Sequence, residues 1–275
     1  MTKKVLILPG DGIGQEVTKS SNEILNYLIS EHSLDFEVNT MDVGGTAYDL
    51  HGSPIPSNVL SSAKDSDAIL FGAVGGPKWD DLSWDDRPEQ ALLTLRKELG
   101  LFANLRPAFL FKELASASPI KNNIIEGLDI LIVRELTGGV YFGEPRAIVK
   151  DETPNYAFNT MIYNEDEIRR IAKIGFESAR KRNGKLCSVE KANVLEVSKF
   201  WREIVTDMSK DYPDVELTHQ LADNTAMQLV LNPNQYDVIV SSNLFGDILS
   251  DIAATLSGSI GMLPSASLNS SSQGM

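Results

Sequence analysis

The chain has 275 residues, enough for two domains or for one large domain with a full hydrophobic core. Apolar residues make up 42% and charged residues 23% of the sequence, which is ordinary for a globular protein. The net charge of -13 argues against nonspecific nucleic-acid binding. A small anionic substrate would need a local cluster of arginines to overcome the negative electrostatic potential of the protein as a whole.

Cysteine, histidine and hydropathy patterns exclude several further classes. The single cysteine, Cys187, cannot form an internal disulfide, which suits a reducing cytoplasm. His32, His51 and His219 lack zinc-site spacing. No apolar run approaches the roughly 20 residues of a membrane span, and the run at 5–8 is too short for a signal peptide. We therefore expect a cytoplasmic protein that binds neither nucleic acid nor membrane.

Short apolar runs alternate with amphipathic segments along the chain. Strands are expected at 5–8, 36–43, 68–71, 130–133 and 238–240, and helices at 13–29, 59–63, 89–99, 165–182, 197–208 and 222–231. This alternation predicts an α/β fold with a largely parallel sheet. The final residues, 265–275, read SASLNSSSQGM, a small polar stretch that could be a flexible tail.

A glycine-rich stretch, LTGGVYFGEPR at 136–146, follows Arg134 and Glu135 at the end of an apolar run. Glycine allows unusual backbone angles and close approach but buries no side chain, so three glycines around Tyr141 are hard to explain as packing. We interpret Tyr141 as a reactive hydroxyl beside an anion-binding arginine. A glycine-rich hairpin with an incidental tyrosine is the alternative.

Two other glycine clusters follow predicted strands. The first, GDGIG at 10–14, does not fit a dinucleotide fingerprint, because the third glycine of G-x-G-x-x-G would fall at Gln15. A tight strand-to-helix turn is the better interpretation. The second includes Gly72, Gly75 and Gly76, and it indicates either close approach of the backbone to a ligand or a surface loop.

Three arginines stand in distinctive local motifs. Arg134 ends a predicted buried strand, where a charge is costly unless it meets an anion. Arg96 lies on a predicted helix and Arg106 in the sequence NLRP. Since a guanidinium grips a carboxylate with two hydrogen bonds, three of them could hold a dicarboxylic acid. Taken singly, each is more often an ordinary surface or ion-pairing arginine.

Asp247 and Asp251 are four residues apart, so on a helix they share one face. Asp223 is a plausible third carboxylate. Oxygen ligands without histidine or cysteine suit Mg²⁺ or Mn²⁺. Two acids on a solvated helix face are the alternative. Lys191 follows another strand-like run and could be an exposed strand-end lysine.

Together these motifs resemble the β-decarboxylating dehydrogenases of the isocitrate/isopropylmalate dehydrogenase family, over residues 4 to about 264. The resemblance implies an α/β fold of two domains with the active-site cleft between them. The cofactor-side domain would comprise residues 1–101 and 258–275, and the second domain, residues 102–257, would carry a homodimer interface.

The resemblance also implies roles for the acids and arginines. Arg96, Arg106 and Arg134 would bind the two carboxylates of a malate-type substrate. The divalent metal would be held by Asp247 and Asp251, together with Asp223 of the partner subunit, which would also contact the substrate.

Tyr141 and Lys191 are the catalytic residues that the resemblance implies. Lys191 would reach Tyr141 across the dimer interface, where an ammonium group would lower the pKa of the tyrosine. The nicotinamide side of NAD would lie along Gly76, Pro77, Lys78, Trp79, Asp80, Asp81, Leu82, Ser83, Trp84, Asp85, Asp86, Arg87, Pro88 and Glu89.

The implied reaction is oxidation of (2R,3S)-3-isopropylmalate by NAD⁺ and loss of CO₂ to give 4-methyl-2-oxopentanoate, in leucine biosynthesis. A sibling activity on isocitrate, homoisocitrate or tartrate is the nearer alternative, although Leu92 and Leu93 favour an apolar substrate arm. A catalytically silent fragment is the other alternative.

Family members continue past the position of Met275 with a segment that binds the adenosine half of NAD. We therefore expect a C-terminally truncated chain that binds NAD⁺ weakly and exposes apolar surface in its first domain. The choice of NAD over NADP rests on the family alone.

Overall fold

The computed structural model describes residues 2–150, 153–271 and 273–275. The chain divides into two compact units, one formed by Met1–Leu101 with Ser267–Met275 and the other by Phe102–Ala266. The predicted domains share the division after residue 101 but assign residues 258–266 to the first domain, whereas here those residues belong to the second unit. The roles of the two domains remain a prediction.

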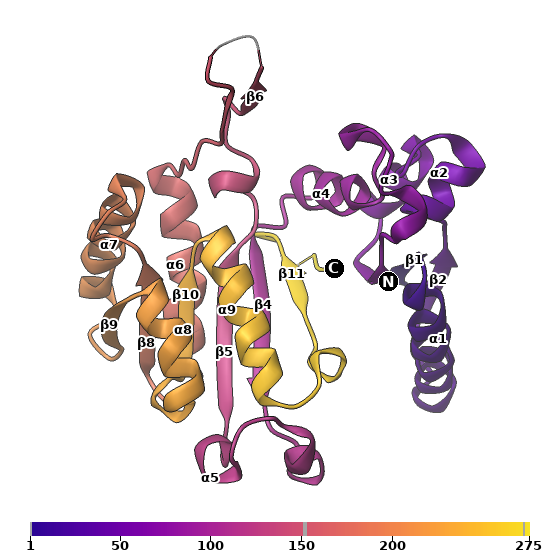
Figure 1. The fold of residues 1–275 in the computed structure, drawn as a ribbon. Helices are drawn as coiled ribbons and strands as arrows, with labels where there is room; N and C mark the ends of the chain where they lie inside the picture. The colour runs from indigo at the N-terminus through magenta and orange to yellow at the C-terminus, as the bar shows by residue number, and fades with distance from the viewer. Residues whose placement is uncertain (1, 151–152, 272) are drawn as a thin grey trace. The chain divides into compact units, whose positions relative to one another are not determined.

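The first unit contains a parallel sheet of three strands in the order β2-β1-β3 (Figure 1). Its strands are β1 (Lys3–Gly10), β2 (Phe36–Thr40) and β3 (Ala68–Ala73), and its helices are α1 (Ile13–His32), α2 (Gly45–His51), α3 (Ser57–Lys64) and α4 (Glu89–Glu98). Leu6 and Leu8 of β1 pack with Val59 of α3 and Leu95 of α4 in one core.

One row of apolar residues on α1 stays exposed, which confirms the expected apolar surface in this domain. The residues are Ile13, Val17, Ile24, Tyr27 and Leu28.

In its described residues, the segment at 265–275 makes regular backbone contacts, unlike the flexible tail that the sequence suggested. It contains a short strand, β11 (Ala266–Leu268). The backbones of Ser267 and Met275 exchange hydrogen bonds of 2.6 and 2.9 Å, and the amide of Ile69 donates to the carbonyl of Gly274 at 2.9 Å. Because backbone groups make these contacts, the small polar composition of the segment carried no signal of them.

The second unit is built on a larger mixed sheet, whose strands follow the order β4-β5-β10-β8-β9 (Figure 1). The strands are β4 (Ala103–Phe109), β5 (Asp129–Glu135), β8 (Lys185–Glu190), β9 (Glu216–Leu221) and β10 (Val238–Ser241). Strands β5, β10, β8 and β9 run parallel, and β4 is antiparallel to β5. The carboxyl ends of the parallel strands therefore lie along one edge of the sheet.

Each face of this sheet has its own core. Val133 and Val240 face α6 (Glu165–Arg180) and α7 (Glu196–Met208). Their neighbours Ile132 and Ile239 face the opposite core, formed with α5 (Asn122–Ile125), α8 (Ala222–Leu231) and α9 (Asn243–Leu256). The alternation follows from the two-residue period of a strand, and apolar residues on both sides explain why β5 and β10 read as continuous apolar runs.

The predicted strands and helices are all present, with ends shifted by a few residues, and the α/β fold is confirmed. The elements not predicted include α2, α5, β4, β9 and the hairpin of β6 (Ala147–Val149) and β7 (Tyr156–Phe158). Within the described parts of the chain, none of the helices combines the length and apolarity that crossing a membrane requires.

Candidate active site

Arg134 carries its charge into the interior at the end of β5, where its side chain is only 3% exposed. Its Nε and Nη2 donate to Oδ1 of Asn243 at 3.1 and 2.8 Å, and Nη1 pairs with Oδ1 of Asp247. Burial lowers the pKa of Arg134, and the Asp247 carboxylate opposes that shift. The anion required by a buried strand-end arginine is thus supplied by α9.

Gly246 allows α9 to approach Arg134 this closely. A Cβ atom at Gly246 would lie 2.7 Å from Cγ and 2.8 Å from Cβ of Arg134. These distances are too short for any side chain, so glycine at this position lets the helix that carries Asp247 pack directly on the stem of the arginine.

Tyr141 converges on the same carboxylate. It ends a 3₁₀ turn, Gly139–Tyr141, and its hydroxyl donates to Oδ2 of Asp247 at 2.8 Å. The guanidinium carbon of Arg134 lies 5.8 Å from the centre of the Tyr141 ring. Three residues predicted from separate motifs therefore meet at one point, each oxygen of Asp247 holding one partner.

The glycines around Tyr141 are explained by packing, contrary to the interpretation from sequence. A Cβ on Gly139, whose φ is +75°, would lie 2.6 Å from the hydroxyl oxygen of Tyr163, and one on Gly138 would lie 2.6 Å from its ring. A Cβ on Gly143 would lie 2.0 Å from the carbonyl oxygen of Thr160. The loop is pressed against its surroundings, which fixes the position of Tyr141.

Glu135 was not singled out from the sequence, yet it holds the start of this loop. Its fully buried carboxylate accepts from the amides of Thr137 at 2.9 Å and Gly138 at 2.8 Å. Arg170 of α6 lies 3.3 Å from the same carboxylate and compensates its charge. In the sequence, only the position of Glu135 next to Arg134 could have indicated that it belongs to the site.

Arg106 and Asp251 form a second group. Arg106 lies on β4, where its Nε donates to Oδ1 of Asn104 at 2.9 Å. Its Nη1 donates to Oγ of Ser250 at 2.8 Å and to Oδ1 of Asp251 at 3.1 Å. Arg106, Ser250 and Asp251 border a cavity of about 170 Å³ that is also lined by Ala108, Ala254, Leu263 and Pro264.

Lys191 and Asp223 form a third group. Nζ of Lys191, just after β8, lies 2.7 Å from Oδ1 of Asp223 in the first turn of α8. The hydrogen bond from Lys191 lowers the pKa of Asp223. Because β10 lies between β5 and β8, the ends of β5 and β8 are about 10 Å apart. Within one chain, this pair is therefore separate from Arg134 and Tyr141.

The predicted metal ligands are only partly assembled. Asp247 and Asp251 lie one turn apart on α9 and present oxygen donors of the kind that Mg²⁺ and Mn²⁺ prefer. Asp223 is engaged elsewhere with Lys191. Across residues 2–150, 153–271 and 273–275, no three histidine, cysteine, aspartate or glutamate side chains are grouped to hold a metal ion. The donor chemistry fits a divalent ion, but a third carboxylate has to be supplied.

The remaining predicted residues belong to the first unit. Arg96 lies on α4. The segment at 76–89 forms two 3₁₀ turns, Pro77–Trp79 and Trp84–Asp86, before α4 begins. Nζ of Lys78 pairs with Asp49 at 2.5 Å, and the indole nitrogen of Trp79 donates to the same carboxylate at 3.2 Å.

The GDGIG sequence forms the tight turn that was expected, and Asp11 gives that turn a further role. Its carboxylate, buried with the residue only 2% exposed, accepts from the amides of Gly45 at 2.8 Å and Thr46 at 2.7 Å, at the start of α2. It also accepts from the amide of Gly75 at 3.0 Å. Asp11 thereby ties the loop that precedes residues 76–89 to β1.

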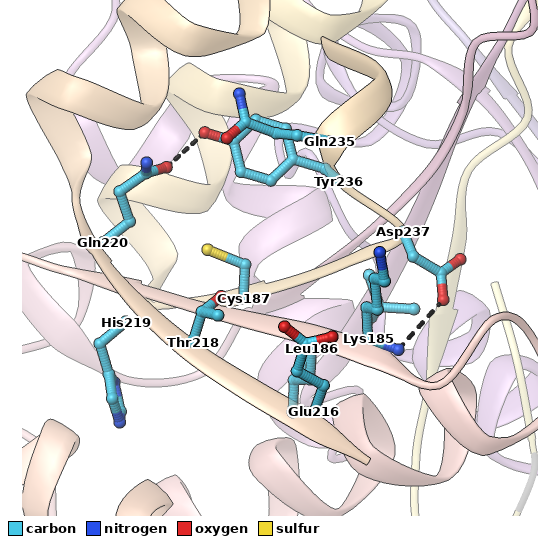
Figure 2. Close-up of a pocket in the computed structure, with 11 residues that line it drawn as sticks. Lys185, Leu186, Cys187, Glu216, Thr218, His219, Gln220, Gln235, Tyr236 and Asp237 are labelled. Atoms are coloured by element: carbon cyan, nitrogen blue, oxygen red, sulfur yellow. Dashed lines mark hydrogen bonds between the residues drawn. The ribbon is translucent and has the colours of Figure 1, made fainter. Parts of the chain in front are cut away.

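A further cavity, of about 230 Å³, lies around the amino-terminal ends of β8 and β10 (Figure 2). Cys187 and Tyr236 line it, and the Tyr236 hydroxyl donates to Gln220. Burial raises the pKa of the Cys187 thiol to about 11, so this thiol is unreactive.

None of the predicted site residues lines this cavity, and ligands of open α/β sheets bind at the carboxyl ends of the strands. The candidate active site is therefore at the other end of the sheet.

The chain is similar to known proteins along its whole described length. Residues 4–275 match the family model described as isocitrate/isopropylmalate dehydrogenase. The chain is 57% identical to the 3-isopropylmalate dehydrogenase of Hydrogenovibrio crunogenus over 276 residues, and 58% identical to that of Bordetella parapertussis over 280 residues. In both cases all of this chain is covered and 77% of the relative.

Among solved structures, the chain is similar to isocitrate dehydrogenase from Methylococcus capsulatus, with a TM-score of 0.86 and 29% identity. The match covers 99% of this chain and 76% of that one. With the sequence matched along its whole length and the fold shared, the chain belongs to the isocitrate/isopropylmalate dehydrogenase family.

Proposed function

We propose that this chain is a 3-isopropylmalate dehydrogenase, which oxidises (2R,3S)-3-isopropylmalate with NAD⁺ and releases CO₂ to give 4-methyl-2-oxopentanoate, in leucine biosynthesis. The observation that carries the proposal is the convergence of Arg134 and Tyr141 on Asp247. The names of the similar curated proteins support the substrate. The 3-isopropylmalate dehydrogenases use NAD and a divalent metal such as Mg²⁺ or Mn²⁺, and both belong to the proposal.

The arginines bind the substrate in this account. Arg134 and Arg106 pair with Asp247 and Asp251, and a dicarboxylate would take the place of these aspartates. That exchange turns the two aspartates toward a divalent ion, so substrate and metal binding favour each other. Arg96 of the first unit is proposed as the third arginine, and residues 76–89 as the side of the cofactor site.

The proton steps fall to Tyr141 and Lys191. When bound, the metal stabilises negative charge on the C2 oxygen as a Lewis acid. Lys191 either tunes Tyr141 as a neighbouring ammonium or, once it is a neutral amine, accepts the proton of the C2 hydroxyl during hydride transfer. After CO₂ leaves, Tyr141 donates its hydroxyl proton to the substrate carbon that lost the carboxylate. The close-packed glycine loop holds that hydroxyl in place.

A homodimer is the second part of the proposal, because it would bring Lys191 and Asp223 of one copy to Tyr141 and Asp247 of the other. Exposed apolar side chains of the second unit support an interface there. They are Met227, Val230 and Leu231 on α8, Ile248 on α9, and Ile148, Tyr156 and Phe158 on the β6–β7 hairpin. A cytoplasmic location is also proposed, and it fits the free, buried thiol of Cys187.

Turnover measurements test the function. The purified chain is mixed with 3-isopropylmalate, NAD⁺ and Mn²⁺, and NADH and CO₂ are measured together. We expect both products in equal amounts, and faster turnover than with isocitrate, homoisocitrate or tartrate. Faster turnover of one of those acids would assign the sibling activity. No turnover of any of them would identify a silent chain and contradict the proposal.

A further inference from the structure

We propose that Asn243 is a positioning residue, which holds the guanidinium of Arg134 and the loop that leads to Tyr141 as one unit. The inference rests on the proposed function for its catalytic meaning. It concerns how two groups of the site are kept in register, and its structural part can be measured without turnover.

The carbonyl side of the Asn243 amide holds the arginine. Oδ1 accepts from both Nε and Nη2 of Arg134, at 3.1 and 2.8 Å. Two hydrogen bonds on one edge of the guanidinium fix its plane, and Nη1 is then directed at Asp247. Orientation matters here because a bidentate grip on a carboxylate depends on the angle of the guanidinium fork.

The nitrogen side of the same amide holds the loop. Nδ2 donates to the carbonyl oxygens of Leu136 at 3.1 Å and Gly138 at 3.2 Å, ahead of Tyr141. Asn243 is 1% exposed, so water cannot replace these partners. A flipped amide would set its NH₂ against the guanidinium and its oxygen against two carbonyls, so only one orientation satisfies all four contacts.

Asn243 also begins α9, the helix that carries Asp247. Its backbone amide donates to the hydroxyl oxygen of Tyr163 at 2.9 Å, which fixes the start of the helix. One residue therefore contacts the arginine, the tyrosine loop and the helix that bears a metal ligand.

Arg106 is held in the same way by a second buried asparagine. Oδ1 of Asn104 accepts from its Nε at 2.9 Å, while Nδ2 donates to Oγ of Ser265 at 2.9 Å and to the carbonyl of Ala266 at 3.1 Å. The recurrence at both proposed substrate-binding arginines of the second unit supports a positioning role rather than incidental packing.

A double-mutant cycle tests the proposal in the full chain. Asn243→Ala should raise KM for 3-isopropylmalate about tenfold or more, since two hydrogen bonds to a charged group are lost. In an Arg134→Lys background the same change should have little further effect on KM, because the guanidinium that Asn243 orients is gone, although the lost contacts to the loop should still lower kcat. Asn234→Ala is the matched control, since Nδ2 of Asn234 also donates to two backbone carbonyls, at 3.3 and 2.9 Å, without touching an arginine. Its KM should stay unchanged.

Arginine NMR gives a readout that is independent of turnover. The Nε–H of Arg134, assigned by its absence in Arg134→Lys, should exchange slowly with water in the parent and rapidly in Asn243→Ala. Continued protection, a KM within about twofold of the parent, or full additivity in the cycle would each overturn the proposal. If the parent shows no turnover, the proposed function fails and the exchange measurement still decides the positioning role.

If Asn243→Ala does not fold, Asn243→Asp replaces it. Aspartate keeps the acceptor for Arg134, but its second oxygen replaces the donor and faces the carbonyl oxygens of Leu136 and Gly138. We therefore expect Nε–H protection to persist and kcat to fall more than KM rises. Unchanged kcat in that variant would overturn the link to the Tyr141 loop.

Discussion

The hydroxyl of Tyr141 donates a hydrogen bond of 2.8 Å to Oδ2 of Asp247, and the other oxygen of that carboxylate pairs with Arg134. The proposed proton donor and the proposed substrate-binding arginine thus share one carboxylate, which is itself a proposed metal ligand.

Tyr141→Phe should lower kcat about 100-fold while changing KM for 3-isopropylmalate much less, because it removes a proton donor and keeps the ring. Steady-state kinetics measure the split. Tyr27→Phe, on the exposed face of α1, is the control and should behave as the parent. A kcat equal to that of the parent would remove Tyr141 from the proton step.

Arg106→Lys should lower kcat/KM for 3-isopropylmalate by more than about threefold while leaving the fold intact, since an ammonium cannot reproduce the two parallel hydrogen bonds of a guanidinium. Circular dichroism checks the fold, and initial rates give kcat/KM. The exposed Arg169→Lys on α6, whose parent residue pairs with Glu165 and Asp207, is the comparison. Equal losses in both variants would show that Arg106 has no special role.

Metal dependence separates the two aspartates of α9. Excess EDTA should abolish activity and added Mn²⁺ should restore it. Asp247→Asn and Asp251→Asn should each weaken Mn²⁺ binding in calorimetry about tenfold or more. Only Asp247→Asn should also lower Tm, because it removes the anion beside a buried arginine, whereas Asp251 is 66% exposed. Full activity in EDTA would exclude the metal.

His219 should make the fold sensitive to mild acid. Burial, with a smaller contribution from Arg202, lowers its pKa from 6.5 to about 4. The unfolded chain then binds the proton more readily, so this contribution to stability is complete above about pH 6.5 and is lost as the pH falls toward 4. The fall in Tm between about pH 7 and 4.5 should be smaller in His219→Gln than in the parent. The exposed His32→Gln is the control, and an equal fall in all three proteins would contradict the assignment.

The sequence predicted most of the fold, because strands buried on both faces and amphipathic helices leave clear periodic patterns. It failed where tertiary contacts supply the stabilising groups. The start of α2 depends on Asp11, which lies 34 residues before Gly45, and β4 contains Arg106 and Pro107, which break its apolar pattern. Neither feature can be recognised from a short stretch of neighbouring residues in the sequence.

The candidate site was predicted residue by residue, but its supporting groups were not. Arg134, Tyr141 and Asp247 stood in distinctive motifs, and the structure brings them together. Asn243 lies only four residues before Asp247, but an asparagine that uses both ends of its amide looks in sequence like any other. Only the three-dimensional arrangement shows what it contacts.

The most direct test of the account asks whether the active site is shared between two copies of the chain. Lys191 and Asp223 pair with each other at 2.7 Å, and the proposed dimer would bring this pair to Tyr141 of the other copy. Tyr141→Phe and Asp223→Asn should each be nearly inactive alone. Unfolded together and refolded as a mixture, they should form mixed dimers in which one of the two sites has both native residues.

Turnover of 3-isopropylmalate with NAD⁺ and Mn²⁺ should then return to about a quarter of the parent rate, since about half of the dimers are mixed and each has one intact site. The parent, taken through the same refolding, sets the reference rate. No recovery above the two separate variants, with mixed dimers shown to be present, would contradict the shared site.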